Sequence, residues 1–396
     1  MATAAHAITY HGGAFFGAIG EEFDTLERAY EVISADVLDA WFPPSPRVLD
    51  AIAEHLPFLM RTSPPTAAGG LVRTIARVQG VPEECVLAGG GSSDLIFLAL
   101  TRWLTGDSRV LILDPMYGEY AHVLERVIGC HVDRLRLARE DDYGFDPQRL
   151  LAIDPSQYDL ILLVNPNSPT GQHVAYRSLA PVVEELSRCT RVWIDETYIE
   201  YAGDDDSLEA LATINEGIVV CKSLSKVYGL SGVRVGYLVG SMGTIAALRP
   251  FSPPWAVGLI GQVAAVHAMN DRDYYRARWL ETHRLRAGLA EGLRALDIHV
   301  VPSVANFLMC HLPAHGPDAA SVVAVARQHD LYLRQLDDMG SALGRHAFRI
   351  AVKDAATNTR MIEILGRVLS EASSSPVPSG VLSAFRSMHE RVTGLP

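Results

Sequence analysis

The chain contains only three lysines, and two of them lie in one short segment. Lys222 and Lys226 both belong to KSLSKVYGLSGVRVGY, a stretch rich in serine and glycine in which Arg234 follows eight residues after the second lysine. A lysine in a polar pocket near cationic groups can lose its proton and attack a carbonyl carbon. Taken alone, the segment could equally be a surface lysine before a turn. It predicts an amine nucleophile only if other polar motifs converge on it.

A carboxylate follows one of the apolar runs. Asp195 ends VWID, and Tyr198 lies three residues further on in IDETYIEY. Such a carboxylate can bind a metal, cap a helix or pair with an organic cation. No His or Cys accompanies it at the spacing of a metal site, so a metal is disfavoured and none is predicted.

Two more motifs follow apolar runs and are typical of ligand-binding turns. GGGSSD, at 89–94, would open a helix, where free N–H groups and the helix dipole favour a phosphate. A tight turn with a serine N-cap explains the same residues equally well. NPNSPTG, at 165–171, fixes an irregular turn that carries Ser168. The second motif is the more specific of the two.

Alternating strands and helices must position these motifs. Several apolar runs in the 68–240 region are hydrophobic on both faces, as expected for a sheet covered on both sides. With intervening helices such as 93–104 and 176–189, they predict a doubly wound, mainly parallel α/β sheet whose strand ends meet at one edge. The predicted strands are 109–114, 160–165, 192–195, 218–223 and 235–240.

The pattern changes after residue 254 and predicts a smaller α+β domain. A long Arg-rich helix at 271–296 leads into strands at 299–303, 305–312 and 348–353 and helices at 319–329 and 356–370. We therefore expect an N-terminal segment (1–54) packing on the small domain, a large domain (55–270), the small domain (271–370), and a linker with a tail helix (371–396).

Composition excludes several classes of protein. The chain has 396 residues and a formal charge of −12, without a basic block, which argues against a nucleic-acid partner. Its five cysteines are an odd number with no C-x-x-C pair, so neither a disulfide framework nor a zinc site is indicated. We recognise no signal peptide and no apolar run long enough to span a membrane, so the prediction is a cytoplasmic protein without a membrane partner.

In this order and spacing, the motifs resemble those of fold-type I enzymes that use pyridoxal 5′-phosphate (PLP). The resemblance covers roughly residues 30–370 and is strongest to the aminotransferase branch near histidinol-phosphate aminotransferase and threonine-phosphate decarboxylase. It implies a large domain with a mainly parallel seven-stranded sheet, PLP as cofactor, a small-molecule amino donor and acceptor, and a homodimer.

The resemblance also implies roles for individual residues. Lys226 would carry PLP as a Schiff base and move the proton at the substrate Cα, Asp195 would pair with the pyridinium nitrogen, and Tyr198 would contact the phenolic oxygen. Tyr117 would stack on the ring, with a place in the hydrophobic core as the alternative. The phosphate would be bound by Ser92, Ser93, Ser223, Ser225 and Arg234.

The region around the substrate matches the family less closely. Ser168 stands where relatives usually have an Asn that donates to the cofactor phenolate. The implied substrate-binding residues are Arg349, with Asn306, Arg334 and Trp41 as weaker candidates. The expected function is transamination of an amino acid or a similar compound in secondary metabolism, with a C–S β-lyase or a decarboxylase of an amino-acid conjugate as the alternative.

Two other classes remain open from the sequence. A PLP-fold regulator would bind ligand without turnover, but we expect it to carry a helix-turn-helix extension, which the acidic N-terminus and the short tail do not provide. A nicotinamide dehydrogenase is less consistent with the sequence, because GGGSSD is not G-x-G-x-x-G.

Overall fold

A computed structural model describes residues 12–374, and the chain divides into two compact units. The large unit contains residues 39–284 and 302–306. The small unit contains, of the described residues, 12–38, 285–301 and 307–374. The predicted linker and tail helix at 371–396 lie mostly outside the described residues. Within 12–374, no helix combines the length and apolar character needed to cross a bilayer.

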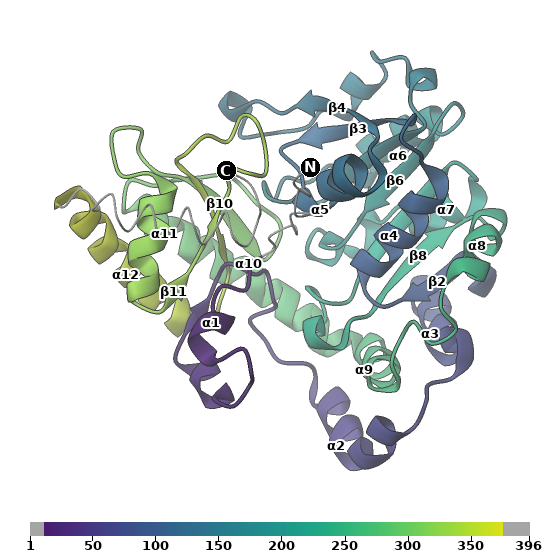
Figure 1. Ribbon diagram of the computed structural model, residues 1–396, viewed down its shortest axis with the longest axis horizontal. Helices are drawn as coiled ribbons and strands as arrows, with labels where there is room; N and C mark the ends of the chain where they lie inside the picture. Colours follow the sequence, from purple (N-terminus) through teal and green to yellow (C-terminus); the bar gives the residue numbers. More distant parts are fainter. Residues whose placement is uncertain (1–11, 375–396) are drawn as a thin grey trace, which may run out of the picture. The chain divides into compact units, whose positions relative to one another are not determined.

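The large unit is built on a seven-stranded sheet with strand order β2-β8-β7-β6-β5-β3-β4 (Figure 1). All neighbouring pairs are parallel except those of β8, which runs antiparallel to β2 and β7. The strands are β2 (Val86–Gly89), β3 (Arg109–Asp114), β4 (His131–Arg136), β5 (Leu160–Val164), β6 (Arg191–Asp195), β7 (Ile218–Ser223) and β8 (Gly236–Gly240).

The central strands are buried on both faces, as their apolar sequences predict. Every residue of β5, β7 and β8 is buried, whereas β4 at one edge of the sheet alternates exposed and half-buried positions. The helices of the large unit are α2 (Pro46–Arg61), α3 (Gly69–Gln79), α4 (Ser92–Trp103), α5 (Gly118–His122), α6 (Tyr176–Leu186), α7 (Glu209–Ile214), α8 (Met242–Leu248) and α9 (Leu259–Met269).

The register of the sheet brings the carboxyl ends of its parallel strands to one edge. Asp195 of β6 lies opposite Cys221 of β7, and Gly236, the first residue of β8, pairs with both Ser223 and Gly89. In open α/β sheets this edge is where ligands bind. The fold thus gathers the ends of β2, β6 and β7, where the polar motifs begin.

The small unit holds two sheets and the helices α1 (Phe16–Ile19), α11 (Ala319–Gln328) and α12 (Ala355–Ser374), while α10 (Arg272–Arg294) contains the boundary at residue 284. A four-stranded antiparallel sheet has the order β12-β13-β10-β9, and β1 pairs in parallel with β11. These strands are β1 (Ile33–Ser34), β9 (His299–Val300), β10 (Phe307–His311), β11 (Leu331–Tyr332), β12 (Arg334–Gln335) and β13 (Ala347–Ala351).

The predicted fold class is confirmed, and the five strands expected between residues 109 and 240 are all present within a residue or so of the predicted limits. The strand expected before GGGSSD is the short strand β2, whereas the sequence pattern did not indicate the polar edge strand β4 or the reversed direction of β8. It also did not reveal α2, which begins at Pro46, directly after a run that the neighbouring prolines made look non-helical.

Candidate functional site

A buried carboxylate occupies the end of β6. Asp195 is 3% exposed, and its Oδ1 accepts hydrogen bonds from the backbone N–H (2.9 Å) and the hydroxyl (2.6 Å) of Thr197. Burial raises the pKa of Asp195, while the hydrogen bonds from Thr197 and Tyr120 oppose the rise and the charge of Glu119 adds to it. The site therefore holds a carboxylate that lacks a cationic partner among the described residues.

A tyrosine and a tryptophan fix the other oxygen of this carboxylate. The Tyr120 hydroxyl donates to Asp195 Oδ2 at 2.7 Å, and Trp193 Nε1 donates to the Tyr120 hydroxyl at 2.8 Å. Both aromatic side chains are fully buried. Because each polar atom in this chain has a defined partner, the Asp195 side chain is held in one orientation.

Tyr117 lies beside the same carboxylate. Its hydroxyl donates to Glu119 Oε2 at 2.7 Å, and its ring meets that of Tyr120 edge-on at 6.0 Å. Burial, followed by the charge of Glu119, raises the pKa of Tyr117 well above its usual value, with smaller contributions from Tyr198 and Asp195. Tyr117, Tyr198 and Asp195, which the sequence placed in one site, are thus brought together.

Ser93 is drawn into the same cluster. Its hydroxyl donates to Glu119 Oε2 at 2.9 Å, on the same oxygen that accepts from Tyr117. One of the residues predicted to bind the phosphate, Ser93, therefore already donates its hydroxyl proton to a carboxylate.

The N-terminus of α4 and Arg234 form an electropositive cradle. Arg234 Nη1 donates to Ser225 Oγ (3.2 Å) and to the Ser231 carbonyl (3.0 Å), and the Ser225 N–H donates to Ser223 Oγ at 3.3 Å. A Cβ on Gly91 would lie 2.7 Å from Arg234 Nη2, and Gly91 has a φ of 96°, so only glycine lets the guanidinium approach this closely. Ser92 opens the helix at this point.

Lys226 lies in the loop that connects β7 to β8. Its Nζ is 2.9 Å from Asp39 Oδ1, and the side chains of this pair are 23% and 42% exposed. Ser231 donates to the same Asp39 oxygen at 2.6 Å. The amine is therefore accessible to solvent and is held by an acid from a distant part of the sequence.

Lys222 has a different environment. Its Nζ lies 2.9 Å from Glu200, 3.7 Å from Glu196 and 4.0 Å from Glu209, and its side chain is 3% exposed. Burial alone would lower the pKa of Lys222, but the charges of the three glutamates outweigh burial and raise it. A buried amine held in its charged form is a poor nucleophile, so Lys226 is the better candidate.

The NPNSPTG turn is fixed by the side chains of its two asparagines. Asn165 exchanges hydrogen bonds with the backbone of Val174, with 2.8 Å in each direction, and Asn167 Nδ2 donates to the Pro115 carbonyl at 3.1 Å. Ser168, which directly follows Asn167, is 3% exposed. Asn165 and Asn167 therefore hold the turn in which Ser168 lies.

Two of the predicted substrate-binding residues belong to the large unit. Asn306 is fully buried in the 302–306 segment, which is tied to the NPNSPTG turn because Val304 N–H donates to the Gly171 carbonyl at 3.0 Å. Trp41 donates from Nε1 to Thr282 Oγ1 at 2.8 Å, and the Arg278 guanidinium lies 5.5 Å from its ring centre. Trp41 is thus anchored on α10.

The other two predicted substrate-binding residues belong to the small unit. Arg334 and Arg349 face each other in register on β12 and β13, and both are 5% exposed. Arg334 pairs with Asp338 at 2.6 Å, and Arg349 Nη2 donates to the Asp36 carbonyl at 3.5 Å. Two buried arginines at paired positions of neighbouring strands are a suitable source of donors for an anion.

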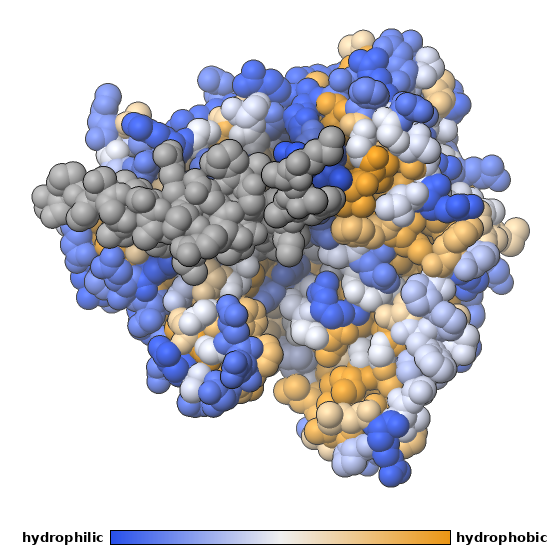
Figure 2. Space-filling view, viewed as in Figure 1, coloured by the Kyte–Doolittle hydropathy of each residue, from blue (hydrophilic) through white to orange (hydrophobic). Residues whose placement is uncertain are grey.

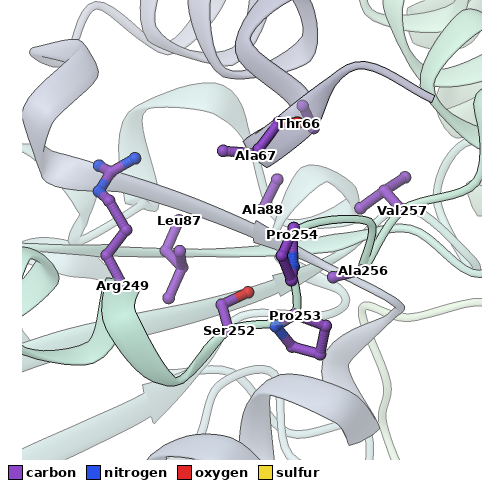
Figure 3. A pocket seen from close by; sticks show the side chains of 11 residues that line it. Thr66, Ala67, Leu87, Ala88, Arg249, Ser252, Pro253, Pro254, Ala256 and Val257 are labelled. Carbon is purple, nitrogen blue, oxygen red and sulfur yellow. The ribbon is translucent and has the colours of Figure 1, made fainter.

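A separate pocket of about 200 Å³ opens along β2 (Figure 3). Arg249 reaches into it from one side and donates to the Val86 carbonyl at 3.2 Å, while the Ala67 N–H donates to the Pro254 carbonyl at 2.8 Å. Its lining contains none of the residues predicted to bind the cofactor. It is formed by Thr66, Ala67, Ala68, Leu87, Ala88, Arg249, Ser252, Pro253, Pro254, Ala256 and Val257.

Three residues of the site were not identified from the sequence. Tyr120 and Glu119 belong to MYGEY, the segment in which Tyr117 was predicted to contact the cofactor. The sequence hint for them was a carboxylate and a second aromatic residue within three positions of Tyr117. Asp39 contacts a residue 187 positions away. No local pattern could have paired Asp39 with Lys226.

Comparison with known proteins gives a consistent assignment. A histidinol-phosphate aminotransferase from Rhodopseudomonas palustris is 27% identical over 353 residues, covering 87% of this chain and 93% of that protein. An L-serine phosphate decarboxylase from Sulfurospirillum multivorans is 26% identical over 319 residues, covering 78% and 80%. The crystal structure of histidinol-phosphate aminotransferase from Sinorhizobium meliloti in complex with PLP superposes with a TM-score of 0.78 at 23% identity, covering 92% and 99%.

The family model for aminotransferase class I and II matches residues 44–367, which is most of the chain. This match confirms the predicted enzyme class and the predicted cofactor, PLP. The chain belongs to the aminotransferase class I and II family.

Proposed function

We propose that this protein transfers the amino group of an amino acid or a related amine that carries an anionic group, with Lys226 as the catalytic amine. The observation that supports this assignment best is the buried Asp195 carboxylate, whose side-chain hydrogen bonds within the described residues come from Thr197 and Tyr120. A protonated ring nitrogen is the partner that such a carboxylate lacks.

The residues present fit PLP at both of its ends. A cation next to Asp195 would stabilise the charged form of a carboxylate whose pKa burial raises. At the other end, Arg234, Ser225 and the first N–H groups of α4 offer charge-assisted and neutral donors to a phosphate dianion. Tyr117 would cover a ring held between them.

Each side chain then has a defined task. When bound, PLP supplies an electron-accepting ring that stabilises the charge left on Cα when one of its bonds breaks. Asp195 would keep the ring nitrogen protonated, and Tyr198 would donate to the phenolic oxygen. Lys226 Nζ would hold or deliver the proton at Cα. Asp39, which accepts a hydrogen bond from the Ser231 hydroxyl, orients that amine whenever it is free.

Arg349 and Arg334 are the proposed anchors of the substrate's anionic group. Their guanidinium groups lie on neighbouring strands and can give several charge-assisted hydrogen bonds to one carboxylate or phosphate. We expect Arg349→Ala to raise KM by about tenfold or more while changing kcat less, because the anchor is made in the ground state as well as in the transition state. An unchanged KM would move the anion site away from Arg349.

Decarboxylation is the second candidate reaction. The observation that favours it is the similarity to the L-serine phosphate decarboxylase of Sulfurospirillum multivorans, at nearly the same identity as the aminotransferase relatives. Ser168, in place of the usual asparagine, changes the donors available to the cofactor phenolate and is compatible with either reaction. Which bond to Cα breaks depends on how the substrate is held, and both reactions need the same Lys226 and Asp195.

The test begins with the purified protein and added PLP. A visible absorption band that borohydride reduction abolishes, with the cofactor mass found on the peptide containing Lys226, would support the assignment. A screen of amino acids and phospho-amino acids by mass spectrometry then distinguishes a keto product from an amine. Absence of the band, or a label on another residue, would refute the role of Lys226.

A homodimer completes the proposal. Figure 2 shows hydrophobic residues gathered over α2, and this helix exposes Leu49, Phe58 and Met60, the last being 72% exposed. Large exposed apolar side chains on one helix favour burial against another copy of the chain. Sedimentation should give a dimer mass, and Phe58→Asp should shift it towards the monomer. A monomer of the unaltered protein would contradict this part of the proposal.

A further inference from the structure

Glu119 is a buried carboxylate with two hydroxyl donors. It is 4% exposed, and its Oε2 accepts from Tyr117 at 2.7 Å and from Ser93 at 2.9 Å. Burying a charge is unfavourable unless hydrogen bonds compensate for its lost hydration. These contacts connect α4, α5 and the turn before α5. Glu119 therefore joins segments that follow the ends of β2 and β3.

The hydroxyl of Tyr117 is the point at which its ring can be fixed. A tyrosine ring on a turn is free to rotate about two side-chain torsions unless its far end is held. The Glu119 contact supplies that restraint, and the edge-on contact with Tyr120 supplies another at the side of the ring. With both contacts, the plane of the Tyr117 ring is defined.

Resting on the proposed function, we propose that Glu119 is a positioning residue for the cofactor. It holds the Tyr117 ring in the orientation that covers the PLP ring, and it directs the Ser93 hydroxyl away from the phosphate. The phosphate is then bound by Ser92, Ser223, Ser225 and Arg234 and by backbone N–H groups of α4, while Ser93 acts through Glu119.

The charge of Glu119 also reaches the ring-nitrogen end of the site. Tyr117, which donates to Glu119, meets the ring of Tyr120, whose hydroxyl donates to Asp195 Oδ2 at 2.7 Å. The charge of Glu119 also contributes to raising the pKa of Asp195. Two carboxylates near one position favour a cation there more strongly than one does. Glu119 thus supports the cofactor through the orientation of Tyr117 and through its field.

Four variants separate these contributions in the full-length protein. Glu119→Ala removes both hydrogen bonds and the charge, whereas Glu119→Gln keeps an oxygen acceptor of nearly the same size and removes only the charge. Tyr117→Phe keeps the ring but loses its anchor, and Ser93→Ala leaves the Tyr117 contact intact. The measurements are the PLP dissociation constant, the visible spectrum of the bound cofactor, and kcat and KM separately.

The expected results follow from the geometry. Glu119→Ala and Tyr117→Phe should each weaken PLP binding by about tenfold, the usual cost of losing a hydrogen bond to a charged group. A variant that combines Glu119→Ala with Tyr117→Phe should bind PLP no more weakly than Glu119→Ala alone, because both changes break the same contact. Glu119→Gln should recover most of the affinity and shift the visible band, and Ser93→Ala should have the smallest effect.

Other results would overturn the inference. If Glu119→Ala and Tyr117→Phe leave affinity and spectrum unchanged, or if their effects add fully in the double variant, Glu119 does not act through Tyr117. If Glu119→Ala fails to fold, the PLP dissociation constants and spectra of Glu119→Gln, Tyr117→Phe and Ser93→Ala still test the inference. Tyr117→Phe should then show the weakest PLP binding of the three. Should the unaltered protein take up PLP at Lys226 while all variants match it, only this inference fails; should it take up none, the proposed function fails.

Discussion

Lys222 and Lys226 are four residues apart, yet their surroundings differ in almost every physical respect. The side chain of Lys222 is 3% exposed and has three glutamates within 4.0 Å, whereas Lys226 is 23% exposed and has one acid, Asp39, at 2.9 Å. The strand β7 ends between them at Ser223. One lysine therefore belongs to the sheet and the other to the loop beyond it.

This difference separates a structural charge from a reactive one. The charge of Lys222 compensates buried carboxylates that would otherwise be unfavourable in the interior, so it cannot be given up. The pair of Lys226 with Asp39 is partly hydrated and can be exchanged for another partner at small cost. A lysine that must form and release a covalent bond in every turnover needs the second environment.

The largest expected effect is that of Lys226→Ala. Catalytic activity and covalent attachment of PLP should both be lost, because residues 12–374 then offer no accessible amine at this edge of the sheet. The fold should persist, since the ion pair of Lys226 with Asp39 is partly exposed and contributes little to stability. Activity assays, the visible spectrum and circular dichroism check this result. Retention of full activity would mean that another amine, with Lys222 as the first to examine, carries the chemistry.

Lys222→Met should affect stability instead. It leaves Glu196, Glu200 and Glu209 buried without their cation, and breaking a buried ion pair from one side costs about 3–5 kcal/mol. Urea unfolding should show this loss, and Lys222→Arg, which keeps the charge, should recover much of it. Variant protein that still folds should attach PLP at Lys226. A stability equal to that of the unaltered protein would remove the contrast between the two lysines.

Glu196→Gln tests the same cluster through pH. Burial raises the pKa of Glu196 to about 7, opposed by the charge of Lys222 and reinforced by Glu209. The unfolded chain releases this proton near pH 4.3, so the folded state binds more protons between about pH 4.3 and 7 and its stability falls as pH rises through that window. Glutamine has no such proton to lose. The free energy of unfolding of the variant, relative to the unaltered protein, should therefore rise between pH 5 and 7, and parallel curves would contradict the assignment.

Asp39→Asn should have the smallest effect on stability. Its side chain is 42% exposed, and ion pairs of this kind contribute about 1 kcal/mol or less. Thermal unfolding should therefore change little, in contrast to Lys222→Met. The rate at which the protein takes up PLP is the more sensitive measurement, since Asp39 contacts the amine directly. A loss of stability as large as that of Lys222→Met would show that the two pairs are equivalent.

The sequence was informative wherever a motif followed an apolar strand. Asp195, Tyr198 and Lys226 could be selected because the strands before them are continuous hydrophobic runs, and the sheet then brings their ends together. The choice of Lys226 over Lys222 came from the order of motifs, and the structure adds the physical reason. The run before GGGSSD likewise forms the edge strand β2, although this strand has only four residues.

The contacts that refine the site could not be read from local patterns. Asp39 reaches Lys226 across 187 positions, and Tyr120 reaches Asp195 across 75. Such pairs depend on how the chain closes around the sheet and leave no periodic signal. The direction of β8 was also hidden, because a strand buried on both faces has the same apolar pattern whether it runs parallel or antiparallel.

The reversal of β8 has a consequence for how the cofactor can be lost. Because β8 starts at the edge where β7 stops, the twelve-position stretch from 224 to 235 needs no crossover helix and remains a short hairpin-like link. This link carries both the amine at 226 and the guanidinium at 234. In the proposed site, the covalent and the ionic tether of the coenzyme would therefore share one stretch of backbone, so that any insertion there would loosen both tethers at once.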